Sequence, residues 1–399
     1  MREYIVIRKL VNEGKFEEAI KKAKEMEDEE EKLMTLCMIA EAMVYEGRKE
    51  EALLLLKEAF KIAEEMENGF AQSLFMSKIA FGIAIAGKVE EALKIASNIK
   101  VSSEKVYTMV RISDLLMDRG EIEGAKKILE EAERITEEMH DDILKVISIK
   151  SVAYAFVDIG EVEKAWNLME HAKNMAEKFD EEASIAFALI AQFMTELGKL
   201  NEAMELIEKI RYNKAWLLSD IAYMKKDVDL LQKAFKIARE MEARYEKVSV
   251  MSNVASIMAE WGRKQEANKL INECIKISEE IECEMEKAMA LAVISHAMFD
   301  NGDERYTSML NKSMEIAKEL ESYEKEDASS SIAHVLIEIG KFNDAMNFIN
   351  GIREEEIKAA VYLSIANDLI NEGKKEEAMK IAEFMNDKIL KGRIKLRET

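Results

Sequence analysis

Apolar, small and polar positions recur along this chain at fixed distances from a glycine. In one copy Ile39 lies eight residues before Gly47, the small Ala40 seven before it, and the large apolar Met43 four before it. These offsets place one apolar face on an α-helix. The glycine then ends that helix, because a left-handed residue costs glycine little. The pattern therefore predicts a series of helices, each closed by a glycine.

A second helix follows each glycine. Acidic residues such as Glu50 and Glu51 come first, where negative charge suits a helix N-terminus, and Ala52 permits close packing. The second helices are expected in two lengths, in the order short, long, short, long, long, short, long, long, long, short, short. Each copy is thus predicted to be an antiparallel helical hairpin that must stack on its neighbours. The shared glycines are Gly14, Gly47, Gly87, Gly120, Gly160, Gly198, Gly262, Gly302, Gly340 and Gly373.

The spacing of small residues resembles the tetratricopeptide repeat (TPR). A glycine follows a small residue by seven positions, and alanines follow the glycine by five and twelve positions. Ala40, Gly47, Ala52 and Ala59 carry this spacing in one copy. The resemblance covers essentially the whole chain, although the closing proline of the family is absent. Its early tryptophan is replaced by residues such as Leu36, Met76, Met109 and Ile149. The resemblance implies an all-α fold, a right-handed α-α superhelix of about eleven hairpins over residues 1–399.

One copy, at 214–246, has lost its glycine. Comparison with the regular copies leaves about seven residues missing around 225–229, roughly one turn from each helix. A notch or hinge and a tolerated deletion at a hairpin tip are both compatible with this irregularity, and we favour the deletion. The irregular hairpin is a candidate division of the single array into residues 1–212 and 247–399.

Charge and composition narrow the class of partner. The net charge is −21, which argues against nucleic acid and anionic membranes and favours a basic partner. We expect no membrane span, no disulfide framework from three cysteines, and a cytoplasmic location. Abundant glutamate and lysine are typical of thermophilic proteins.

The TPR resemblance implies that first helices line a concave surface. Positions two and six before each glycine lie opposite the buried face. The position two before it is acidic in six consecutive regular copies, whereas the position six before it varies in chemistry. We predict a groove there for a basic or amphipathic segment, although acidic residues also simply solvate helices. The predicted partner-binding residues are Glu41, Tyr45, Phe81, Ile85, Asp114, Asp118, Tyr154, Asp158, Gln192, Glu196, Glu260, His296, Asp300, His334 and Glu338.

No nucleotide-binding, hydrolase or metalloprotease motif is present, so we assign no catalytic, cofactor-binding or metal-binding residue and expect no enzyme. His296 and His334 occupy equivalent positions in adjacent copies. We interpret them as paired polar groups in a groove in preference to a metal or pH-sensing site. The expected function is a protein–protein interaction scaffold. A self-associating structural array and a ligand-responsive regulatory sensor remain open alternatives.

Overall fold

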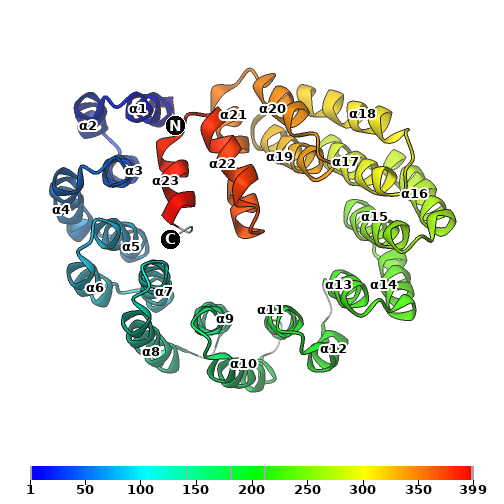
Figure 1. Ribbon diagram of the computed structural model, residues 1–399, viewed down its shortest axis with the longest axis horizontal. Helices are drawn as coiled ribbons and strands as arrows, with labels where there is room; N and C mark the ends of the chain where they lie inside the picture. Colours follow the sequence, from blue (N-terminus) through cyan, green and yellow to red (C-terminus); the bar gives the residue numbers. More distant parts are fainter. Residues whose placement is uncertain (1, 141, 180–181, 211–212, 397–399) are drawn as a thin grey trace. The chain divides into compact units, whose positions relative to one another are not determined.

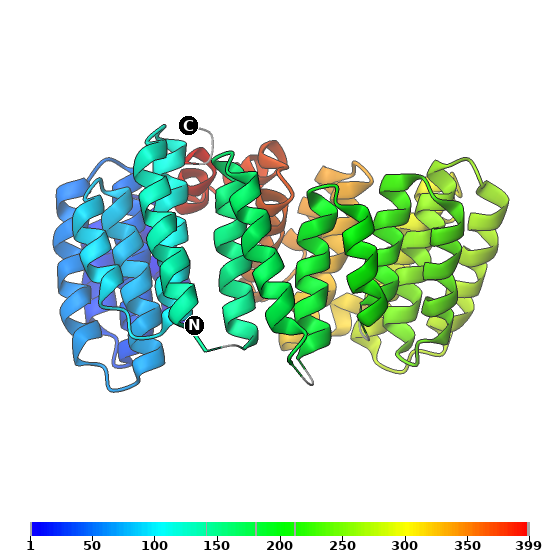
Figure 2. The same cartoon turned by 90° about the horizontal axis from the view of Figure 1, so that it is seen from below.

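The computed structural model describes residues 2–140, 142–179, 182–210 and 213–396, and these residues form 23 helices and no strand. The first 22 helices follow one another as eleven hairpins, and one further helix closes the chain. The prediction of an all-α array of TPR-like hairpins is therefore confirmed. Figure 1 labels the helices in chain order, and Figure 2 shows the same ribbon from a second side.

The chain divides into two compact units. Unit 1 comprises residues 1–190 and 375–399, and unit 2 comprises residues 191–374. The helices α1–α10, α22 and α23 belong to unit 1: Arg2–Asn12, Phe16–Glu25, Glu29–Tyr45, Lys49–Glu65, Gly69–Ile85, Val89–Ser97, Ser102–Asp118, Ile122–Glu138, Ile143–Asp158, Val162–Ala176, Lys375–Phe384 and Lys388–Leu396.

Helix α11, Ala183–Glu196, contains the boundary between the units, and α12–α21 belong to unit 2. Their bounds are Leu200–Lys209, Lys214–Lys225, Val228–Glu240, Arg244–Glu260, Lys264–Glu279, Glu284–Asp300, Tyr306–Glu319, Ser322–Glu338, Phe342–Asn350 and Glu355–Asn371. The irregular hairpin, α13 and α14, lies inside unit 2. The division at 214–246 stays a prediction.

All ten predicted glycines adopt the left-handed conformation, with φ between 73° and 97°. At the first of the long hairpins the Gly47 N–H donates to the Val44 carbonyl at 3.0 Å, and the Arg48 N–H donates to the Met43 carbonyl at 2.8 Å. This pair of bonds is the Schellman motif, which satisfies carbonyls that the ending helix leaves open. The glycine spacing therefore marks the end of each first helix, as predicted.

The irregular hairpin ends its first helix with lysine in place of glycine. Lys226 has φ 53° and Asp227 donates to the Ala222 carbonyl at 2.9 Å, which repeats the bond of the regular copies. Helix α13 has 12 residues and α14 has 13, whereas the regular first and second helices reach 17. The hairpin is thus shortened on both sides of its tip, and its turn is preserved.

The second helices show the predicted order of lengths. The short ones, α2, α6, α12, α20 and α22, have 9 or 10 residues, and the long ones have 13 to 17. The last carbonyls of the long helix α4 are hydrogen-bonded by a side chain of the next hairpin. The buried Gln72 amide donates to the Ala63 and Glu64 carbonyls at 3.1 and 3.0 Å. The carbonyls that the end of α4 leaves open are therefore satisfied by a side chain beyond its own hairpin.

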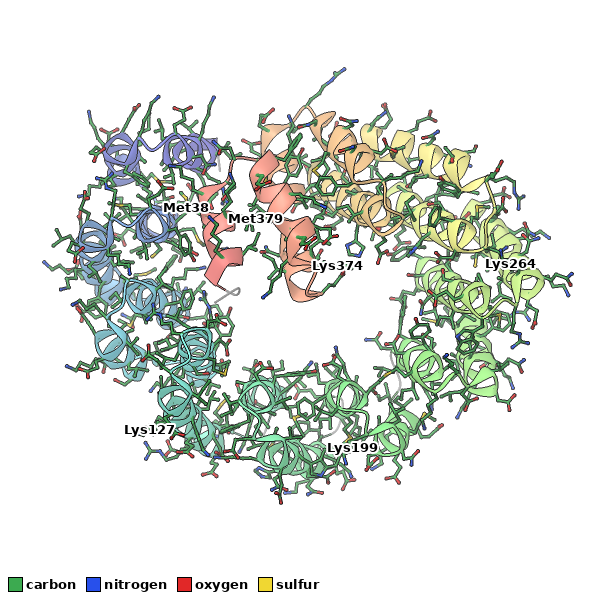
Figure 3. The ribbon with its side chains drawn as sticks, viewed as in Figure 1. Met38, Lys127, Lys199, Lys264, Lys374 and Met379 are labelled. Atoms are coloured by element: carbon green, nitrogen blue, oxygen red, sulfur yellow. The ribbon has the colours of Figure 1, made fainter. Side chains whose placement is uncertain are left out.

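In each unit the first helices form one layer and the second helices form the other (Figure 1). Buried apolar residues and the recurring alanines fill the space between the layers, and the alanines of both helices are fully buried at Ala40 and Ala52. Lys127 of α8 and Lys264 of α16 belong to the second-helix layers (Figure 3). The first-helix layer is therefore the surface on which functional side chains need to be sought.

Candidate functional site

A pocket of about 720 Å³ lies on the first-helix layer of unit 2. Every residue that lines it belongs to α13, α15, α17, α19 or α21, which are the first helices of five consecutive hairpins. These helices pack directly against one another in order, so equivalent positions of adjacent hairpins come side by side. Residues at the same position of successive repeats therefore lie next to one another and form one continuous lining.

The pocket is strongly acidic. Seven carboxylates line it, and none of the described residues in the lining is a lysine or an arginine. The carboxylates are Asp220, Glu260, Asp300, Glu326, Asp327, Glu338 and Asp368. Because low-dielectric walls concentrate the field of like charges, such a pocket attracts cations.

Two histidines connect three carboxylates into a ladder across adjacent hairpins. The His296 Nδ1 lies 3.3 Å from Glu338 Oε2, and its Nε2 lies 3.7 Å from Asp300 Oδ2. The His334 Nε2 lies 3.4 Å from Glu338 Oε1 and 3.4 Å from Glu372 Oε1. Glu338 therefore stands between the two imidazoles and holds both of them at the pocket wall.

The pocket shifts the protonation of its ionisable groups. The hydrogen bond to Glu338 raises the pKa of His334, although burial acts against it. Burial alone would raise the pKa of Glu338, but the His334 hydrogen bond and the charge of His296 together hold that pKa below its usual value. Burial raises the pKa of Asp220 to about 6, and it also raises the pKa of Asp368. Asp220 therefore keeps its proton to a higher pH than an ordinary aspartate, and His334 keeps its positive charge to a higher pH than an ordinary histidine.

Apolar and aromatic groups alternate with the charges. Trp216 and Tyr223 come from α13, Ile257 from α15, and Met289 and Val293 from α17. The carboxylate of Glu260 lies beside the Tyr223 hydroxyl, and its charge and hydrogen bond raise the pKa of that phenol. The lining can therefore surround an apolar body and a cationic group at the same time.

No family model and no curated protein matches the chain, whereas solved structures do match it. Ton1535 from Thermococcus onnurineus NA1 is 19% identical, with 92% of this chain and 99% of that chain covered and a TM-score of 0.31. The apo form of RapI is 12% identical, with 92% and 98% covered and a TM-score of 0.35. The apo quorum sensor NprR from B. thuringiensis is 13% identical, with 88% and 96% covered and a TM-score of 0.32.

The eleven hairpins, their Schellman turns and their small-residue packing decide the architecture. The chain is a TPR-like helical-repeat protein. Its repeats keep the small residue, glycine and alanine of the TPR pattern and lack the closing proline. In this TPR-like protein the first helices of unit 2 carry the pocket.

Seven of the sequence-predicted residues lie in unit 2. Five of them line the pocket together: Glu260, His296, Asp300, His334 and Glu338. Gln192 and Glu196 are exposed on α11, where the Gln192 amide donates to the Glu196 carboxylate at 3.0 Å. The spacing thus brings the C-terminal members of the predicted set to one site.

The N-terminal members in unit 1 have other partners. Glu41 accepts hydrogen bonds from Tyr45 at 3.1 Å and from Arg393 of α23 at 2.6 and 2.7 Å. The Phe81 ring is covered by the Arg111 guanidinium, 3.6 Å from the ring centroid. Ile85, predicted on the open face, is only 3% exposed and belongs to the core. These four residues therefore do not form an open apolar end of a groove.

The remaining predicted residues of unit 1 lie on α7 and α9. Asp114 and Asp118 are half-buried on α7, whereas Asp158 is exposed at the end of α9. The Lys150 ammonium lies 5.6 Å from the centroid of the Tyr154 ring. Their part in binding stays a prediction.

Sequence reasoning missed more than half of the lining. Ser249 and Asn253, which lie 13 and nine residues before Gly262, are followed by Ser256 and Glu260 six and two before it. This three- and four-residue spacing continues one helix face, so extending the two predicted positions by two turns would have found them. Asp220 lies six residues before Lys226, which takes the glycine's place.

Within the described ranges no group of three or more histidine, cysteine, aspartate or glutamate side chains is arranged to hold a metal ion. In the same part of the chain no helix combines the length and the apolar character that crossing a membrane requires.

Proposed function

We propose that this TPR-like protein is an interaction protein whose unit 2 pocket binds a cationic, amphipathic segment of a partner protein. The observation that carries the proposal is the lining itself, seven carboxylates with no lysine or arginine among the described lining residues. NprR has been solved with its cognate peptide NprX, but the proposal for this chain rests on its own pocket.

The mixture of groups supports a peptide-like ligand in preference to a small inorganic cation. Carboxylates from five hairpins accept hydrogen bonds from lysine or arginine side chains, and charge-assisted bonds of this kind are the stronger ones. Trp216, Tyr223 and Met289 offer contact for apolar side chains between the charges. A segment that alternates basic and apolar residues satisfies both kinds of group.

The test is a binding titration with a labelled helical peptide of leucine and lysine at amphipathic spacing. The intact chain is compared with a Glu260→Lys/Asp300→Lys variant, which reverses two charges of the lining. We expect about a tenfold or larger loss of affinity, since each ion pair at a partly exposed site is worth up to about 1 kcal/mol. A leucine–glutamate peptide of the same length should not bind the intact chain.

A matched variant separates the pocket from the general charge of the molecule. Glu279→Lys/Glu315→Lys makes the same change in net charge on exposed positions of the second helices α16 and α18. It should leave affinity within about twofold, because screened surface charges away from the ligand contribute little. An equal loss in both variants would mean that binding is non-specific attraction to an acidic surface, and would refute the proposal.

A further inference from the structure

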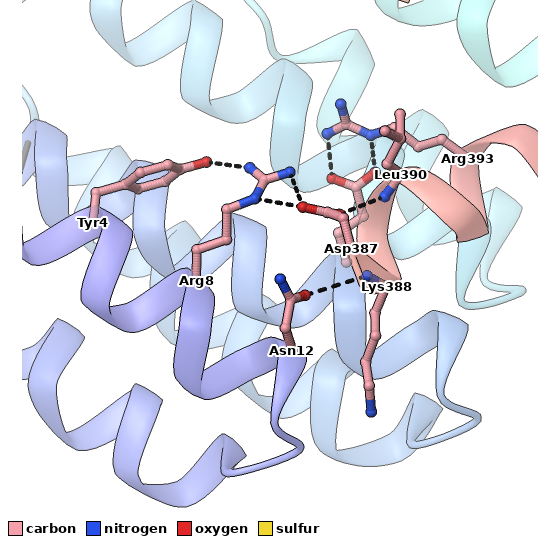
Figure 4. A network of polar contacts seen from close by, with 8 residues as sticks. Tyr4, Arg8, Asn12, Asp387, Lys388, Leu390 and Arg393 are labelled. Carbon is pink, nitrogen blue, oxygen red and sulfur yellow. Dashed lines mark hydrogen bonds and ion pairs between the residues drawn. The ribbon is translucent and has the colours of Figure 1, made fainter. Parts of the chain in front are cut away.

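The last helix of the chain lies on the first-helix layer of unit 1. Helix α23, Lys388–Leu396, packs against α3 and α22 and beside α1 (Figure 4). Arg393 donates two hydrogen bonds to the Glu41 carboxylate, at 2.6 and 2.7 Å. The Lys388 ammonium lies 3.1 Å from Glu46, and the Lys388 N–H donates to the Asn12 amide oxygen at 3.2 Å. The chain therefore covers this surface with its own basic helix.

Helix α23 has the composition of an amphipathic ligand. Ile389, Leu390 and Ile394 are at most 1% exposed, whereas its lysines and arginine form the polar side. Gly392 faces the Tyr45 ring so closely that a Cβ at position 392 would overlap the ring. The absence of a side chain at this position is what allows the helix backbone to approach α3.

Helix α23 is held by polar contacts at two places, at its first residues and at Arg393. Its first residues are held by the buried Asp387, whereas the Arg393–Glu41 pair further along is 49% and 14% exposed. A helix of nine residues is marginal in water without its docking surface, so the order of α23 depends on these contacts. The turn before it depends on Asn386 at a left-handed φ of 50°. Helix α23 is therefore a short segment whose helical order and position both depend on the surface of α1 and α3.

We propose that the surface formed by α1 and α3 is a second binding site, distinct from the unit 2 pocket. Its ligand is a cationic amphipathic helix of a partner protein with a small residue opposite Tyr45, and α23 occupies the site until that helix replaces it. Charge complementarity at Glu41 and Glu46 and the seated α23 define the ligand. Because α23 is tethered at high effective concentration, a partner has to bind far more tightly than a free copy of α23 to displace it.

The test uses the full chain and a labelled synthetic peptide with the sequence of residues 386–396. In a Gly392→Leu variant the new side chain collides with Tyr45 and drives α23 from its surface. We expect this variant to bind the peptide at least tenfold more tightly than the unaltered chain does. Arg393→Glu, which reverses the partly exposed ion pair with Glu41, is a milder second way to open the site. It should act in the same direction if Gly392→Leu folds poorly.

Three controls make the outcome decisive. Measured with Glu260→Lys/Asp300→Lys also present, so that the unit 2 pocket does not take up the peptide, the same peptide with leucine in place of its glycine should bind the opened variants at least tenfold more weakly, because it meets Tyr45. Adding Glu41→Arg to the Gly392→Leu variant should abolish the gain, whereas Glu260→Lys/Asp300→Lys in unit 2 should leave it unchanged. Equal binding of both peptides, or of the opened and unaltered chains, would overturn the proposal. A dimer of the opened variant that takes up no peptide would also overturn it, in favour of a second copy as the occupant.

Discussion

The guanidinium of Arg8 in the first helix donates to the carboxylate of Asp387 just before the last helix, with Nε 2.7 Å from Oδ2. Asp387 is fully buried, and the side chain of Arg8 is 12% exposed. The other oxygen of Asp387 accepts the Leu390 N–H at 2.8 Å and so caps α23 (Figure 4). One carboxylate thus joins residues 379 apart in the sequence and starts the closing helix.

Replacing Asp387 by alanine should loosen α23 by about 3 kcal/mol, because the Arg8 charge stays behind without its partner and the helix loses its cap. Repeat arrays do not unfold in one step, so the measurement is hydrogen exchange of the α23 amides. Arg8→Met should act in the same direction, and the double variant should cost less than the sum. For comparison, Glu13→Ala removes the exposed ion pair with Lys15 and should leave α23 exchange unchanged. Unaltered exchange in Asp387→Ala would contradict this account.

The hairpins could be predicted because their signals are local. The turn at Gly47 and the two lengths of second helix depend on residues within one or two turns of the glycine. The Arg8–Asp387 contact has no such signal, since nothing in a repeat indicates that its first and last helices meet. A repeat pattern therefore predicts neighbours and leaves out contacts between distant copies.

Those parts of the candidate site that depend on local spacing could be predicted, and the others could not. His296 and His334 were placed side by side by their equal distance from a glycine, and the structure joins them through Glu338. Trp216 escaped prediction because its hairpin has no glycine from which to count. Ile85 was misjudged because helix spacing describes one helix, whereas its burial depends on the neighbouring helices.

Lys226 allows a test of whether glycine stabilises these left-handed turns, because here glycine can be introduced where the chain lacks it. Its φ of 53° costs a residue with a side chain roughly 1 kcal/mol, so Lys226→Gly should stabilise the α13–α14 hairpin by up to that amount. Gly262→Ala is the matched change at a regular turn. There φ is 77° and no atom lies within 4 Å of an added Cβ, so only backbone strain acts and a loss of about 1 kcal/mol is expected. Local hydrogen exchange measures both. Stabilisation by Lys226→Gly together with destabilisation by Gly262→Ala would support the role of glycine at these turns. A destabilising Lys226→Gly would contradict it.

Binding of the cationic peptide in the unit 2 pocket should weaken as pH falls. Asp220, with a pKa raised by burial to about 6, loses its negative charge between pH 8 and 5.5. His334, whose pKa is raised chiefly by its bond to Glu338, gains a positive charge as pH falls. Both changes make the lining more positive at low pH, which predicts roughly tenfold weaker binding at pH 5.5 than at pH 8.

Titrations of the leucine–lysine peptide at several pH values measure this effect, because lysine side chains stay charged throughout the interval. Asp220→Asn/His334→Gln removes both titrating groups and should flatten the profile. A profile that stays equally steep in this variant would assign the dependence to other groups and refute the assignment made here.

The acidic residues predicted outside the pocket decide how much of the first-helix layer a partner uses. Asp118 and Asp158 lie in unit 1 and Glu196 in unit 2, and none of them lines the described pocket. Reversing all three to lysine should weaken a long natural partner segment by about tenfold, since distributed ion pairs each add up to about 1 kcal/mol. The short leucine–lysine peptide, which fills only the pocket, should bind this variant within about twofold of the unaltered chain. Isothermal titration with peptides of increasing length measures the difference. If affinity for every length is unchanged, the binding surface ends at the pocket and the extended groove is ruled out.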